Sequence, residues 1–258
     1  MYATDYLATA ILNAARGQSF AAPTTLYLGL FLSNPGKTGT AGTEVSYPGY
    51  LRQKVTFSAP APMNGGLGIQ NAANITFPTP TVAVGNIMFL GLFDSLVGGN
   101  MLLYGPFAET LSIGAYEAPV VIAGMAQWWQ TGNMGIAYKT SVLNTMRGTS
   151  LAGFTPYLAL FNGNPESGGA ELTGTGYKRT PMTFTAPAKQ DAGQMLIENT
   201  AEVTTEISVG TWGVMNHFAV MDALSSGKPF FYRDRPAKEI TNNITILINT
   251  GELKTTIT

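Results

Sequence analysis

The sequence predicts a mainly β protein with two tandem antiparallel β-sandwich domains, each of which begins with a short α-helix. One unit of sequence occurs twice, and its apolar segments are short and bounded by glycine and proline. Parallel strands would need a crossover of about a dozen residues, usually helical, and none is visible between the predicted strands. These observations favour antiparallel sandwiches over an α/β fold.

The duplication is clearest in one apolar segment. Tyr-Leu-Gly-Leu-Phe at 27–31 recurs as Tyr-Leu-Ala-Leu-Phe at 157–161, and an Asn-Pro pair follows each copy. Other matched positions are Arg16 and Arg147, Glu44 and Glu171, Tyr50 and Tyr177, Arg52 and Arg179, Asp94 and Asp222, and Tyr104 and Tyr232. Because a unit of about 125–130 residues is an ordinary domain size, we expect domains at 1–126 and 137–258 and a linker at 127–136.

The first copy begins with a predicted helix over residues 4–17. Thr4 or Asp5 can cap its start by accepting an unpaired backbone N–H, and Leu7 and Ile11 share one face. Gly17 suits the left-handed position that ends a helix. Since this helix starts the chain, its Leu7–Ile11 face is our first candidate interface with a neighbouring protein.

The predicted strands are short. They cover residues 26–32, 52–57, 72–77, 87–93, 101–104 and 119–125 in the first copy, and 157–161, 214–221, 230–232 and 244–249 in the second, with 253–257 as a continuation. Pro60 and Pro62 cannot donate ladder hydrogen bonds and so predict a connection. In the linker, Trp128 and Trp129 are expected to pack between the copies and restrict their motion.

Composition excludes several classes of protein. Charged residues make up 11% of the chain, against about a quarter in typical soluble domains. A net charge of −1 argues against binding to nucleic acid, and the absence of cysteine excludes disulfides and thiolate metal sites. No apolar run reaches the roughly 18 residues of a membrane span, and the first residues do not predict a secretory signal.

Charge is divided unevenly between the copies. Residues 1–133 hold four basic and five acidic side chains, whereas residues 134–258 hold ten of each. Charge-poor surface is typical of protein interfaces. One hypothesis is that the first copy lies inside an assembly while the second projects outward. Drift between duplicated domains is an equally good explanation of the sequence.

The repeated unit resembles a known family. The features that carry the resemblance are the short helix, the Leu-Tyr-Leu-Gly-Leu-Phe strand, Thr-Glu-Val-Ser at 43–46, Gly-Tyr-x-Arg at 49–52, Asn-Ala-Ala-Asn-Ile-Thr-Phe-Pro at 71–78, and the hairpin at 93–104. The chain is similar to small virion structural proteins of tailed bacteriophages, often called tail fibre proteins. The resemblance covers the first copy and, more loosely, the second. It implies a non-enzymatic role in the virion, whereas the tandem form departs from the usual single domain.

Few residues suggest chemistry. His217 stands where the first copy has Phe89, which favours a structural histidine, and one histidine without cysteine does not make a zinc site. Asp94 and Asp222 could bind a metal, but capping of the following turn explains both more simply. Glu198, Glu202 and Glu206 are expected to form a solvated face. The retained Glu44–Arg52 and Glu171–Arg179 pairs predict ion pairs that hold a loop to a strand. We expect no enzyme activity and no cofactor.

The favoured function is a structural component of a tailed-phage virion, as an anchor, spacer or adaptor in the tail, fibre or head–tail region. Its expected partners are other virion proteins of the tail, fibre, connector or capsid, and further copies of itself, but neither nucleic acid nor membrane. Capsid decoration is the first alternative. A receptor- or glycan-binding module is the second, with Tyr47 and Tyr50 as its candidate residues. Candidate interface residues are Leu7, Ile11, Trp128 and Trp129.

Overall fold

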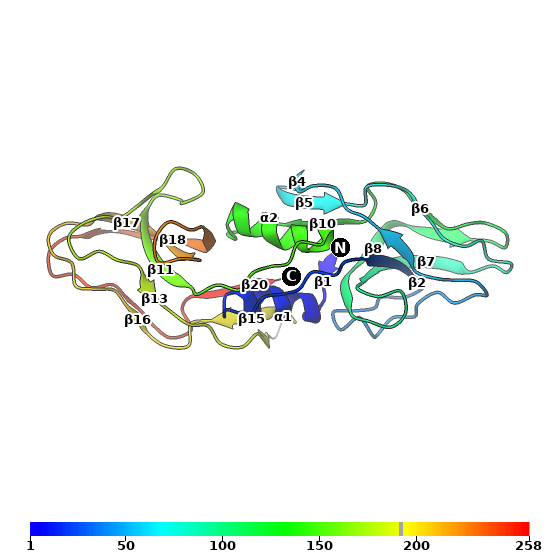
Figure 1. The fold of residues 1–258 in the computed structure, drawn as a ribbon, viewed down its shortest axis with the longest axis horizontal. Coiled ribbons are helices and arrows are strands. Elements are labelled where there is room, and N and C mark those ends of the chain that lie inside the picture. Colours follow the sequence, from blue (N-terminus) through cyan, green and yellow to red (C-terminus); the bar gives the residue numbers. More distant parts are fainter. Residues whose placement is uncertain (191–192, 258) are drawn as a thin grey trace.

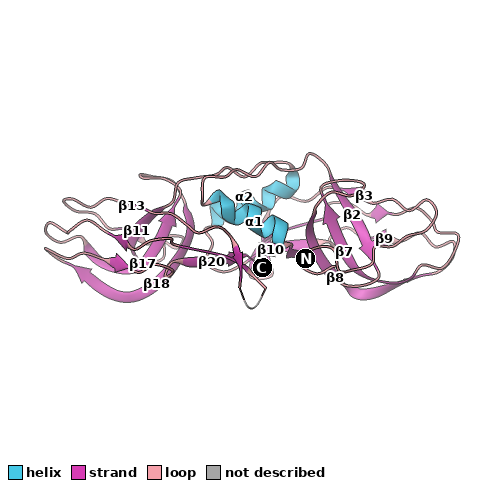
Figure 2. Ribbon diagram, turned by 90° about the horizontal axis from the view of Figure 1, so that it is seen from below, coloured by secondary structure: helices cyan, strands magenta, loops and turns pink. Residues whose placement is uncertain are grey.

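The computed structural model describes residues 1–190 and 193–257. It is elongated, with β-sheets at both ends and two helices between them (Figures 1 and 2). We call α1 and β1 to β10 repeat one, and α2, η1 and β11 to β20 repeat two. The prediction of a mainly β fold with two similar halves is confirmed.

Repeat one contains a large and a small antiparallel sheet. The large sheet has the order β1-β8-β7-β2-β3, the small sheet has the order β10-β5-β4, and β6 pairs with β9. The elements are β1 (Tyr2–Ala3), α1 (Asp5–Ala14), β2 (Leu26–Phe31), β3 (Gln53–Val55), β4 (Ala61–Met63), β5 (Gly66–Gln70), β6 (Ile75–Thr76), β7 (Gly85–Phe93), β8 (Met101–Ile113), β9 (Val120–Val121) and β10 (Gln127–Gln130).

Repeat two has the same arrangement. Its large sheet has the order β12-β11-β17-β18 with β13 on β11, its small sheet has the order β14-β15-β20, and β16 pairs with β19. The elements are α2 (Ile136–Asn144), η1 (Thr145–Arg147), β11 (Tyr157–Asn162), β12 (Ala170–Glu171), β13 (Thr180–Pro181), β14 (Ala188–Lys189), β15 (Met195–Glu198), β16 (Val203–Thr204), β17 (Gly213–Met221), β18 (Pro229–Ile240), β19 (Leu247–Ile248) and β20 (Lys254–Ile257).

Local sequence explains how the helices begin and end. The Thr4 hydroxyl caps α1 by accepting from the Leu7 backbone N–H at 3.4 Å. Gly135 occupies the matching position before α2 and provides no side-chain cap. Gly17 and Gly148 follow the helices with φ of 80° and 84°, in the left-handed region that glycine adopts without strain.

Each helix packs on the small sheet of the opposite repeat. α1 contacts β15 and β20 in addition to β1 and β8, while α2 contacts β5 and β10 in addition to β18. The Tyr138 hydroxyl on α2 donates to the Ile11 carbonyl on α1 at 3.0 Å. One hydrophobic cluster therefore includes buried residues of both repeats.

The packing of each helix on the opposite repeat is accompanied by symmetric contacts between the loops that follow the two helices. Phe20 and Leu151, which hold equivalent positions, form a two-residue antiparallel bridge with N···O distances of 2.8 and 2.9 Å. The Ser19 hydroxyl accepts from Gly153 N–H at 3.0 Å, and the equivalent Ser150 hydroxyl accepts from Ala22 N–H at 3.1 Å. Equivalent residues that bond reciprocally are typical of a two-fold, isologous interface. The single chain thus folds as a pseudo-dimer.

Part of the expected linker is a strand. Residues 127–130 form β10, which pairs with β5 as β20 pairs with β15. This segment therefore has a counterpart at the end of repeat two, which the sequence comparison missed because Trp128 aligns with Thr255. The domain boundaries at 126 and 137 stay a prediction.

The small sheets and the length of β8 were also missed. Pro62 lies in β4, an edge strand, where a proline is tolerated because one side of the strand needs no ladder bond. β8 continues to Ile113, whereas the predicted strand ended at residue 104. The glycines of β5 and the register shift within β8 obscure the period-two pattern that predicts strands.

Candidate functional site

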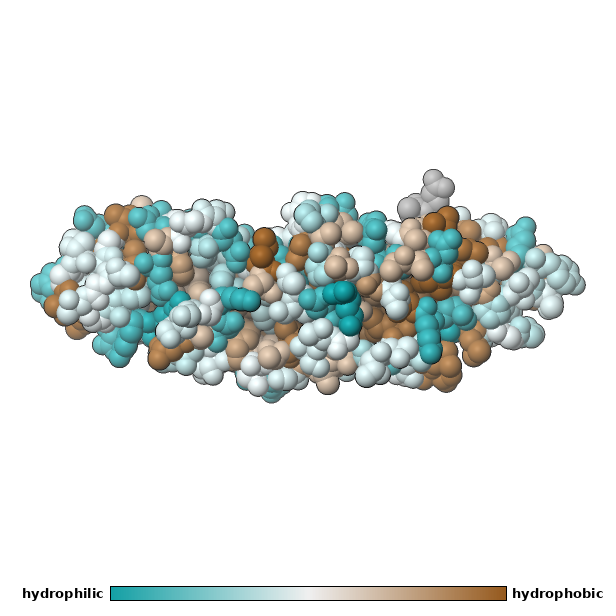
Figure 3. Space-filling view, turned by 45° about the horizontal axis from the view of Figure 1, so that its top comes forward, coloured by the Kyte–Doolittle hydropathy of each residue, from teal (hydrophilic) through white to brown (hydrophobic). Residues whose placement is uncertain are grey.

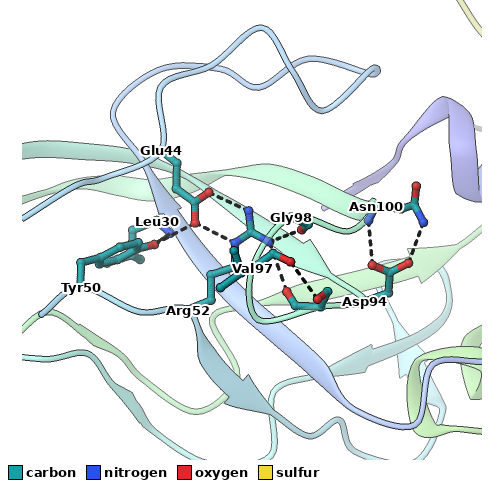
Figure 4. A network of polar contacts seen from close by, with 9 residues as sticks. Leu30, Glu44, Tyr50, Arg52, Asp94, Val97, Gly98 and Asn100 are labelled. Carbon is teal, nitrogen blue, oxygen red and sulfur yellow. Dashed lines mark hydrogen bonds and ion pairs between the residues drawn. The ribbon is translucent and has the colours of Figure 1, made fainter.

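The polar network retained in both repeats centres on an arginine. Arg52 Nε and Nη2 donate to the two oxygens of Glu44, each at 2.8 Å, and the Tyr50 hydroxyl donates to Oε1 at 3.2 Å (Figure 4). Arg52 Nη1 donates to the carbonyls of Ser95 and Gly98 at 3.2 and 2.7 Å. The guanidinium also lies 3.3 Å from the centroid of the Phe93 ring. The Arg52 side chain, directly before β3, thus connects two separate loops.

Repeat two builds the same network. Arg179 donates to both oxygens of Glu171 at 2.9 and 2.7 Å and to the carbonyls of Ala223 and Ser226 at 2.6 Å each. The predicted ion pairs are therefore present. Their arginine side chains are only 10% and 6% exposed, so these pairs are more buried than typical surface ion pairs.

The tyrosines of the network are held in their neutral form. Tyr50 OH accepts from Leu30 N–H at 2.9 Å, and Tyr177 OH accepts from Leu160 N–H at 3.1 Å. Burial, followed by the neighbouring carboxylate, raises the pKa of both hydroxyls well above the ordinary tyrosine value. Every polar group of the network has a partner, so its geometry suits loop fixation rather than acid–base catalysis.

Asp94 and Asp222 cap turns, as predicted. Asp94 accepts from the backbone N–H and the side-chain amide of Asn100 at 2.7 and 2.8 Å. Asp222 accepts from Lys228 N–H at 2.7 Å. Within residues 1–190 and 193–257, no three His, Cys, Asp or Glu side chains gather as a metal site would require.

The other residues considered for chemistry or glycan binding have structural surroundings. His217 is half-buried and its Nδ1 lies 2.9 Å from Asn216 Oδ1. Tyr47 is buried and donates to the Pro78 carbonyl. Glu206 pairs with Lys178 at 2.8 Å on exposed surface. Tyr47 and Tyr50 are thus part of the packing and do not form an exposed aromatic platform.

The four candidate interface residues lie in different surroundings. Leu7 and Ile11 are fully buried within the chain, on the helix that contacts repeat two, so a neighbouring protein cannot reach them in this conformation. Trp128 is 1% exposed on β10, a strand that contacts α2 of the other repeat. Trp129 is 37% exposed. Only Trp129 presents its side chain to the solvent.

A groove of about 590 Å³ separates the two repeats beside Trp129. Tyr2, Trp129 and Gln130 contribute from one side, and Arg233 and residues 254–257 from the other. The strands β10 and β20, which hold equivalent edge positions in the two small sheets, both line this groove. The sequence comparison could not find this groove because it is formed by segments that are far apart along the chain.

Two tandem β-sandwiches, each with a helix packed on the small sheet of the other, make this a modular two-domain β protein. The chain belongs to a phage fibre family: the model of the podophage GP4 fiber I protein gp80 matches residues 2–127 and, a second time, residues 134–256. The resemblance to tail fibre proteins and the tandem repeat are thereby confirmed, and the protein has a structural role in the virion. A comparison with curated proteins finds no match. Among the described helices, none is long and apolar enough to cross a membrane.

Proposed function

We propose that the chain is a rigid spacer or adaptor in the tail, fibre or head–tail region of the particle, attached through repeat one. The observation that supports this most directly is the reciprocal packing of the helices. α1 and α2 each fill the space between a large sheet of their own repeat and a small sheet of the other. Hinge motion would expose buried side chains such as Leu7 and Ile11, so the repeats move as one body.

Further contacts across the seam support the same proposal. Lys37 Nζ on repeat one donates to the Gly193 carbonyl on repeat two at 2.7 Å, and Lys189 pairs with Asp5. Arg16 Nε donates to the Phe184 carbonyl at 3.3 Å. A rigid two-lobed rod with chemically different ends can hold two partners at a fixed separation.

The alternatives have less support. Capsid decoration requires the same rigidity and is separated only by its place and number in the particle. The glycan-binding module depended on Tyr47 and Tyr50, which the structure uses for packing. Family membership favours a structural role over an enzymatic one.

The experiment uses virions that carry single thiol labels. Because the chain has no cysteine, Val97→Cys or Leu224→Cys introduces one labelling site, in the turn between β7 and β8 of repeat one or between β17 and β18 of repeat two, where Val97 is 76% and Leu224 is 55% exposed. We expect a few labels per particle at the tail or head–tail junction, with the Leu224→Cys site accessible and the Val97→Cys site protected. Labels spread over the whole shell would show decoration instead. Equal labelling of both sites would contradict attachment through repeat one.

A further inference from the structure

The outer face of the large sheet in repeat one carries a group of apolar residues. Tyr2 pairs with Tyr104 across β1 and β8, with ring centroids 5.8 Å apart, and Phe89 pairs with Pro106 across β7 and β8. We call these four residues the repeat-one face. Tyr2 is 53% exposed, Pro106 is exposed and Phe89 is half-buried, while Tyr104 is buried beneath the Tyr2 ring with 8% of its surface exposed. Their strand neighbours Leu90 and Leu103 point to the opposite side, into the main core.

Three of the four equivalent positions in repeat two are polar. Asn133, His217 and Asp234 replace Tyr2, Phe89 and Pro106, whereas Tyr232 matches Tyr104. His217 pairs with Asp234 across β17 and β18, as Phe89 pairs with Pro106. Because repeat two builds the same sheet with polar residues, the fold does not require apolar residues on the repeat-one face. A requirement outside the fold therefore explains them better.

Hydrophobic side chains are distributed unevenly over the molecular surface (Figure 3). Figure 3 shows hydrophobic residues gathered in a broad region over the half of the molecule that repeat one forms. Trp129, at the edge of the groove that Tyr2 also lines, corresponds to Thr256 in repeat two. Grouped exposed apolar residues that are surrounded by polar surface are typical of an interaction site.

We propose that the repeat-one face binds the repeat-one face of a second copy of this chain. None of its four side chains is charged, so two copies can meet without like-charge repulsion, whereas a charged partner would have to bury an unpaired charge. The face on repeat two carries Asp234 and His217, which disfavours the same contact there. Pairing through one face only gives a closed two-fold dimer instead of a filament. This inference goes beyond the proposed function and does not depend on where the chain lies in the particle.

The test transfers the polar pair of repeat two onto repeat one. We expect the full chain to be a dimer whose molar mass falls to that of the monomer on dilution, measured by sedimentation equilibrium. The variant Phe89→His with Pro106→Asp should be monomeric throughout, with unchanged circular dichroism, since the same residue pair occurs on the equivalent strands of repeat two. A wild-type chain that stays monomeric, or a folded variant that dimerises as tightly as the wild type, would overturn the proposal.

A reciprocal variant provides a second test, which remains valid if Phe89→His with Pro106→Asp prevents folding. His217→Phe with Asp234→Pro gives repeat two the residues of repeat one. Chains with an apolar face at each end should associate beyond the dimer, with a weight-average mass that rises with concentration. If this variant remains no larger than the wild type, the apolar face does not mediate association and the proposal fails.

Discussion

The two repeats share their interior and differ in their surface. Both contain the arginine network, the capped turn after β7 or β17, and a helix buried against the opposite repeat. Charge, by contrast, is concentrated in repeat two, and positions such as Phe89 and Pro106 become His217 and Asp234. The interior is therefore what the fold requires. The surface is where the two copies differ in residue type and charge.

The largest expected effect tests the shared interior. Arg52→Ala or Arg179→Ala removes four hydrogen bonds and leaves a half-buried carboxylate without its partner. We expect each variant to lose about 3–5 kcal/mol of unfolding free energy in urea titrations. Arg52→Lys should recover little of this loss, because an ammonium group cannot form the two parallel bonds to Glu44.

The two arginine networks differ in one contact. Arg52 stacks on Phe93, whereas the position equivalent to Phe93 in repeat two is Met221. Arg52→Ala should therefore cost about 0.5–2 kcal/mol more than Arg179→Ala. If both losses stay below about 1 kcal/mol, the networks contribute no more than exposed ion pairs do.

An intermediate effect concerns pH. Burial raises the pKa of Tyr50 and Tyr177 above the value of about 10 found in unfolded chains. Above pH 10 the unfolded chain loses these protons while the folded chain keeps them, so stability falls as pH rises. We expect each tyrosine to contribute up to about 1.4 kcal/mol per pH unit to this fall.

The double variant Tyr50→Phe with Tyr177→Phe measures that contribution. It should lose about 1–3 kcal/mol per site at neutral pH, because the main-chain donors of Leu30 and Leu160 and the carboxylates lose a partner. Its stability should then decline less steeply than that of the wild type between pH 10 and about 11. Tyr138→Phe is the control, since burial also raises the pKa of Tyr138 but its hydroxyl lies outside the networks. Parallel pH profiles of the double variant and the wild type would contradict this account.

The sequence predicted the features that depend on local patterns or on the duplication, namely the helix ends and the retained polar network. Thr4 and Gly17 mark the ends of the first helical segment, and the retained Glu44 and Arg52 marked the network before any distance was known. The packing of each helix on the small sheet of the opposite repeat could not be predicted from such local patterns. Leu7 and Ile11 form an apolar face, but nothing in a local pattern says which sheet covers it. Phe20 and Leu151 pair across the molecule without any shared residue type to connect them.

The sequence also could not tell which of the candidate interface residues are exposed. The two tryptophans are adjacent in sequence, yet strand geometry sends them to opposite faces of β10, with Trp128 1% and Trp129 37% exposed. Depletion of charge in the first copy fitted an interaction surface and drift equally well, and it named no residues. The surface proposed above could be defined only after the sheets had shown which residues of repeat one occupy positions that are polar in repeat two.

The smallest expected effect separates the two tryptophans. Trp129→Thr copies the residue of repeat two at the equivalent position, Thr256, and should change the unfolding free energy by about 1 kcal/mol or less, because the ring already lies partly in water. The neighbouring control, Trp128→Thr, copies Thr255 but should cost about 3–5 kcal/mol, since it leaves a cavity under α2. Urea titration of both variants gives the two losses directly. Equal losses would mean that β10 does not present one face to the core and the other to the solvent, and Trp129 would then belong to the shared interior rather than to the surface on which the repeats differ.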